Sequence, residues 1–77
     1  MTRLPSAVTA AELARLHILF RQWPCSARLP RQISKAKRRL AWELRQESQA
    51  LRNQVFKKLR DADAATLARV AQMLEAS

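Results

Sequence analysis

The fold of this chain is decided by residues 30–60, which read PRQISKAKRRLAWELRQESQALRNQVFKKLR. The stretch contains no glycine, no proline after Pro30 and few β-branched residues, a composition that favours helix along its whole length. Pro30 suits the first turn of a helix, where its missing N–H needs no partner. The stretch therefore predicts one helix over residues 30–60, roughly 45 Å long at 1.5 Å per residue.

The predicted helix has two unlike faces. At about 100° per residue, its apolar side chains fall on one stripe. They are Ile33, Leu40, Leu44, Leu51, Val55 and Leu59. The opposite face carries an arginine at every seventh position: Arg31, Arg38, Arg45 and Arg52. Trp42 and Phe56 interrupt this cationic face, whereas Glu43 and Glu47 lie near the edge of the apolar stripe. We expect one face to be buried and the other to offer cations to a partner.

A second helix is predicted before this stretch. Thr9 and Glu12 have the spacing of a capping box, in which the hydroxyl accepts from the Glu12 N–H and the glutamate reaches back. The pattern predicts a helix over about residues 10–23, and Pro24 ends it because proline interrupts the helical hydrogen bonds.

A third helix is predicted after it. Asp61 and Asp63 are favourable N-cap residues for a helix over about residues 64–76. The expected fold is all-α: a single small helical domain, residues 1–77, in which a long central basic amphipathic helix is flanked by two shorter helices.

The shorter helices are long enough to cover most of the central apolar stripe. We expect the first to pack on the N-terminal half of the long helix and the last on its C-terminal half. The alternative is a projecting central helix whose free half packs on a partner. The predicted buried residues are Leu13, Leu16, Phe20, Leu40, Leu44, Leu51, Val55, Leu67, Val70 and Leu74.

Composition restricts the functions that the chain can have. Fifteen Lys and Arg against six Asp and Glu give a formal net charge of +9 in 77 residues, which favours a polyanionic partner such as nucleic acid or an anionic membrane surface. The absence of glycine argues against phosphate-cradling loops and dinucleotide-binding motifs. No apolar run approaches the roughly 20 residues that span a bilayer.

The N-terminal region also has the composition of a mitochondrial targeting segment, being arginine-rich, almost free of acids and amphipathic. The single cysteine allows no internal disulfide, so we expect a reducing compartment: the mitochondrial matrix or the bacterial cytoplasm.

Catalysis is not expected. His17 is the only histidine and has no second ligand at metal-binding spacing, so we interpret it as a partly buried or surface residue. Arg21 and Arg28 lie close to Cys25 in the sequence, but no histidine base accompanies the cysteine. We therefore predict no enzyme activity, no metal site and no cofactor.

The strongest functional signal is the distribution of cations. Residues 1–42 hold nine basic residues and one acid, Glu12. The candidate nucleic-acid-binding residues are Arg28, Arg31, Lys35, Lys37, Arg38, Arg39, Trp42, Arg45, Arg52, Lys57, Lys58 and Arg60. Arginine binds phosphate oxygens at two points, and Trp42 could stack on an unpaired base.

We expect a non-catalytic accessory subunit of a ribonucleoprotein, such as a bacterial or organellar ribosome, with RNA favoured over DNA and other protein subunits as neighbours. One alternative is a non-catalytic accessory or assembly subunit of a large protein complex, for example a mitochondrial one, anchored by Trp23, Trp42 and Phe56. The other is a dimeric DNA-binding regulator, in which a second copy covers the exposed apolar length.

Overall fold

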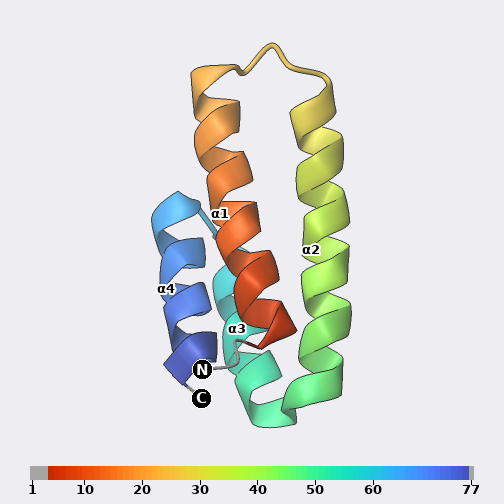
Figure 1. Ribbon diagram of the computed structural model, residues 1–77, viewed down its shortest axis with the longest axis vertical. Helices are drawn as coiled ribbons and strands as arrows, with labels where there is room; N and C mark the ends of the chain where they lie inside the picture. The colour runs from red at the N-terminus through yellow and green to blue at the C-terminus, as the bar shows by residue number, and fades with distance from the viewer. Residues whose placement is uncertain (1–3, 77) are drawn as a thin grey trace.

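The computed structural model describes residues 4–76, which form four α-helices and no strand. The helices are α1 (Pro5–Gln22), α2 (Arg28–Glu47), α3 (Gln49–Leu59) and α4 (Ala64–Ala76). Their directions alternate along the chain, so that each helix returns beside the one before it (Figure 1). The predicted all-α class is confirmed, whereas the predicted number of three helices is wrong. Among the described helices, none is long and apolar enough to cross a membrane.

The first helix begins earlier than the sequence pattern predicts. α1 starts at Pro5, which occupies its first turn, and Thr9 lies one turn inside the helix instead of capping it. The predicted capping box is therefore not formed. Proline is well placed at a helix start because its φ is already helical and its missing N–H has no partner there. The observed end of α1 at Gln22 lies one residue before the predicted end at residue 23. The Trp23 N–H still donates to the carbonyl of Leu19 over 2.9 Å.

The predicted helix over residues 30–60 is divided at Ser48. Its backbone is extended there, with φ −144° and ψ 128°, and α3 then runs back beside α2 (Figure 1). The Ser48 Oγ accepts from the Leu51 N–H over 3.5 Å and so serves as the N-cap of α3. As a result, the longest extent of the molecule is 36 Å, shorter than the roughly 45 Å of the predicted straight helix.

α2 begins at Arg28, two residues before the predicted start, and still holds Pro30 in its first turn. The last helix has the predicted bounds of 64–76. Of its two candidate caps, Asp63 is the one used: its Oδ1 accepts from the Thr66 N–H over 2.8 Å. Hydrogen bonding to Thr66 lowers the pKa of Asp63, because it stabilises the ionised carboxylate.

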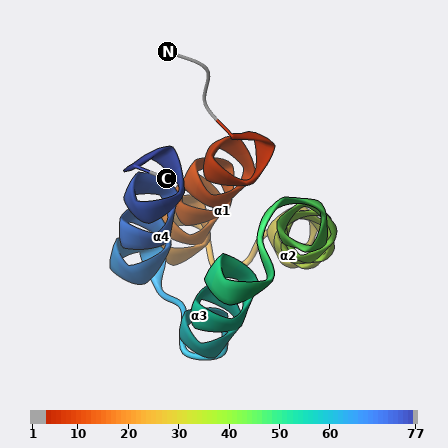
Figure 2. The same ribbon diagram turned by 90° about the horizontal axis from the view of Figure 1, so that it is seen from below.

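The four helices are arranged in a ring. Figure 2 shows α1 between α2 and α4, with α3 completing the ring between the same two helices. The predicted pairings are present, since α1 packs on α2 and α4 packs on α3, the N- and C-terminal parts of the predicted central helix. The single straight central helix is wrong, because α2 and α3 fold back on each other and α4 also packs on α1. The turn between α1 and α2 extends beyond the turn between α3 and α4 (Figure 1).

Most of the predicted core is buried. Leu13, Leu40, Leu44, Val55, Leu67, Val70 and Leu74 are fully enclosed. The other predicted core residues, Leu16, Phe20 and Leu51, are half-buried against the same cluster. The core also includes Ala7, Ala10 and Ala14, all from α1. Small side chains let neighbouring helices approach closely, so α1 can lie in contact with two helices at once.

Candidate nucleic-acid interface

One face of α2 carries a row of exposed cations. Spacings of three and four residues place them on a single helical face, and the row is about 21 Å long at 1.5 Å per residue. We call this row the cationic stripe; its cations are Arg31, Lys35, Arg38 and Arg45, with Trp42 on the same face, and all five side chains are exposed. The buried residues of α2, such as Leu40 and Leu44, lie on the opposite side of the helix. The stripe therefore faces away from the core.

The two acids of α2 do not share this face. Glu43 is only 7% exposed, and Thr9 of α1 donates its hydroxyl hydrogen to the Glu43 Oε1. The Ser6 hydroxyl donates to the Oε1 of Glu47 over 2.7 Å. Both carboxylates are thus held against α1, so neither acid of α2 lies on the stripe. The nearest acid from another helix is Glu12 of α1, which lines a hollow together with Lys35 and Arg39.

Helix polarity favours the same arrangement. Ser6 is the second residue of α1, so its bond places the Glu47 carboxylate at the first turn of that helix. The first turn of α1 contains no acid of its own. A negative charge there interacts favourably with the positive end of the helix dipole. The neighbouring helix therefore supplies the anion that α1 lacks.

The remaining predicted site residues lie on other surfaces. Arg28 is exposed at the start of α2. Arg39 lies at the side facing α1, where its Nε is 3.8 Å from the Glu43 Oε2. Arg52 is half-buried on α3, and Lys57, Lys58 and Arg60 are exposed near the end of that helix or just after it. Because α3 runs back beside α2, the predicted straight row of four arginines ends at Arg45.

Because α3 folds back along α2, residues that are far apart in the sequence come together. A shallow hollow is lined by Lys37 of α2, by Phe56 and Leu59 of α3, and by Arg60. We call it the Phe56 hollow. Lys37 and Arg60 were predicted as separate phosphate contacts, and Phe56 was not among the predicted site residues. No local sequence signal could have joined Lys37 to Phe56, since their proximity depends on the turn at Ser48.

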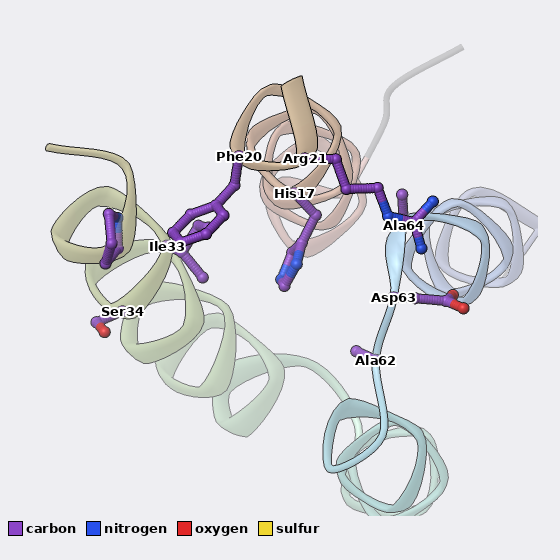
Figure 3. Close-up of a pocket in the computed structure, with 9 residues that line it drawn as sticks. His17, Phe20, Arg21, Ile33, Ser34, Ala62, Asp63 and Ala64 are labelled. Carbon is purple, nitrogen blue, oxygen red and sulfur yellow. The ribbon is translucent and has the colours of Figure 1, made fainter. Parts of the chain in front are cut away.

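A second hollow surrounds His17. It lies between α1, the start of α2 and the turn before α4. His17 and Phe20 point into it from α1, and Arg21 extends along its edge toward Ala64 at the start of α4 (Figure 3). The Nε2 of His17 is buried and has no hydrogen-bond partner. Burial lowers the pKa of His17, and the nearby charges of Lys37 and Arg21 lower it further against the opposing effect of Asp63.

The hollow contains no ligand set for a metal. Among residues 4–76, no three His, Cys, Asp or Glu side chains are grouped closely enough to hold a metal ion. The lowered pKa of His17 favours its neutral imidazole form, in a hollow whose lining combines apolar side chains with Arg21 and Asp63.

A third hollow lies at the projecting α1–α2 turn. Its lining includes Leu19, Trp23, Cys25, Arg28 and Leu29, and is mostly apolar. Trp23 is 60% exposed there, and the Cys25 thiol is also exposed. The turn thus presents a large aromatic ring at the end of the molecule.

Comparison of the chain with protein-family models, with curated proteins and with solved structures finds no match. The interpretation of the site therefore rests on the geometry and charge described above.

Proposed function

We propose that the protein binds the phosphate backbone of nucleic acid, RNA in preference to DNA, through the cationic stripe. We infer that it serves as a non-catalytic accessory subunit of a ribonucleoprotein such as a ribosome. The observation that carries the proposal is the separation of charge on α2: four exposed cations lie on one face, while Glu43 and Glu47 are bonded to α1. A merely solvated helix face ordinarily interleaves both signs.

Binding of nucleic acid through the cationic stripe would recognise the charge and shape of the phosphate backbone. Arg31, Arg38 and Arg45 follow each other at intervals of about 10 Å along the helix, and each can bind a phosphate through its planar fork. Trp42 lies between Arg38 and Arg45 and offers an exposed ring, 61% accessible, to an unpaired base. Nothing in the stripe resembles a base-reading set, so the contacts position the nucleic acid without selecting a sequence.

The salt dependence of binding tests the proposal. For four phosphate contacts, the slope of log K against log[salt] should be about −3 on single strands and about −4 on duplex DNA. Arg38→Gln should weaken all sequences alike and flatten the slope by about one unit. Arg69→Gln is the matched control, because Arg69 is exposed on α4, which does not contact α2. Salt-independent binding, or equal effects of the two substitutions, would contradict the proposal.

A second candidate function is that of an accessory subunit in a protein complex. The exposed Trp23 ring beside the apolar hollow at the α1–α2 turn favours it, since aromatic and arginine side chains often anchor protein interfaces. Trp23→Ala should then release the chain from its complex after nuclease treatment, with nucleic-acid affinity unchanged. For the third alternative, a dimeric DNA-binding regulator, the packing offers no support, because α1 and α4 already cover the apolar residues that a second copy was expected to cover.

A further inference from the structure

We infer that the Phe56 hollow is a binding site for one unpaired nucleobase, and that the protein consequently binds single-stranded nucleic acid in preference to duplex. The inference rests on the proposed function and adds to it a second contact, on a different face of the molecule. Its basis is the meeting of an exposed aromatic ring with two cations, contributed by segments about 20 residues apart, in one hollow.

The composition of the hollow fits a base. Phe56 is 36% exposed, whereas its neighbour Val55 is completely buried. Leu59 packs against the core and continues the apolar surface. Lys37 and Arg60 complete the lining, and no carboxylate is among the lining residues. The hollow therefore joins an apolar surface to two positive charges.

These features match the two parts of a nucleotide. An aromatic face stacks on any base, because every base has a π-face. Lys37 and Arg60 can neutralise the phosphates on either side of the stacked base, and Arg60 can bind its phosphate at two points. A base in a duplex is already paired and stacked, so it could enter the hollow only after unpairing, which costs a few kcal/mol. The preference for single strands follows from that difference.

Phe56 and Trp42 have different surroundings. Trp42 lies on the open stripe, between arginines of its own helix. Phe56 lies in a hollow whose cations come from α2 and from the end of α3. A ring that is flanked from two elements restricts where the base and its phosphates can lie, so we assign the larger part of the single-strand preference to Phe56, with Trp42 as the second ring that can stack on an unpaired base.

The experiment compares two labelled probes by fluorescence anisotropy in the same buffer: a 12-nucleotide oligouridylate and a 12-base-pair RNA duplex. Phe56→Leu keeps an apolar side chain of similar volume but removes the π-face. It should weaken binding of the oligouridylate by about 5- to 150-fold, the range of single base–aromatic stacks, and leave duplex binding unchanged. Phe56→Trp should restore binding to the parent level or above it. Far-UV circular dichroism and thermal melting verify that each variant is folded.

Trp23→Ala is the matched control, because it removes another exposed ring at the far turn, outside the Phe56 hollow. It should change neither affinity. The inference is overturned if Phe56→Leu binds oligouridylate as the parent does, or if it weakens both probes equally. In both cases salt-dependent binding through the stripe would persist, and the proposed function would stand. A parent protein that binds neither probe would overturn the proposed function and, with it, this inference.

Discussion

At the scale of single residues, the contact with the largest consequence is the bond between Thr9 and Glu43. It fixes α1 against α2 and turns a carboxylate away from the cationic stripe. The Thr9 oxygen also lies 3.1 Å from the carbonyl of Pro5. A hydroxyl has one hydrogen to give, and an ionised acceptor forms the stronger bond. The carboxylate therefore takes the hydrogen.

We predict that Thr9→Val destabilises the protein by about 1–3 kcal/mol, the cost of leaving a buried acceptor without its donor. Equilibrium urea unfolding followed by circular dichroism measures the change. The double variant Thr9→Val, Glu43→Leu should lose less, since removing both partners leaves no buried polar group unpaired. If the double variant is less stable than Thr9→Val alone, the bond is not the source of the effect.

His17 should make stability depend on pH in a defined window. Its pKa is lowered from the ordinary value of 6.5 in the folded protein, first by burial and then by Lys37 and Arg21, with Asp63 opposing. Below pH 6.5, His17 binds a proton in the unfolded chain at a pH where it stays unprotonated in the folded chain, so protonation favours unfolding. The contribution of His17 is thus complete above pH 6.5 and decreases as the pH falls toward the folded-state pKa.

Urea unfolding between pH 7.5 and pH 5 checks this expectation. Relative to His17→Gln, which cannot titrate, the parent should lose stability progressively below pH 6.5. Parallel curves for the two proteins throughout that range would show that His17 has the same pKa in both states.

At the scale of secondary structure, the turn at Ser48 is where sequence reasoning failed. Ile33, Leu40 and Leu44 lie on the same stripe as Leu51 and Val55 of an ideal continuous helix, so the periodicity gives no sign of a break. Serine is also only mildly unfavourable within a helix. The turn is decided by tertiary packing, because folding α3 back lets Val55 enter the core formed by the other helices.

We predict that Ser48→Ala destabilises the fold by about 1 kcal/mol, because it removes the N-cap of α3 and favours helix through the turn. Ser48→Asp keeps a cap and adds a negative charge at the helix start, so it should retain the parent stability. Thermal melting of both variants checks the pair. A more stable alanine variant would indicate that the turn does not need its cap.

The local features were predictable and the non-local ones were not. The bounds of α4 and its Asp63 cap follow from residues within one turn of each other. The exposure of Arg31 and Arg38 follows from the helical period alone. The pairing of Glu43 with Thr9, 34 residues away, and of Phe56 with Lys37 required the packing of helices, which periodicity does not contain.

At the scale of the whole molecule, the charge of +9 on 77 residues acts on stability and on binding with opposite signs. The cations repel one another in the compact state, so added salt should stabilise the fold. The same salt should weaken nucleic-acid binding, because each counterion released from the nucleic acid gains less entropy in a more concentrated salt solution. A cationic surface kept despite its cost in stability is expected where that surface binds a partner.

The two effects can be separated with one pair of variants. Arg38→Gln and Arg69→Gln each lower the net charge by one, so each should raise the melting temperature modestly at low ionic strength, and the gain should disappear at high salt. Only Arg38→Gln should lose affinity for RNA, because only Arg38 belongs to the cationic stripe. If instead Arg38→Gln lowers the melting temperature while Arg69→Gln raises it, Arg38 stabilises the fold through its own contacts, and its place on the stripe would need no nucleic acid to explain it.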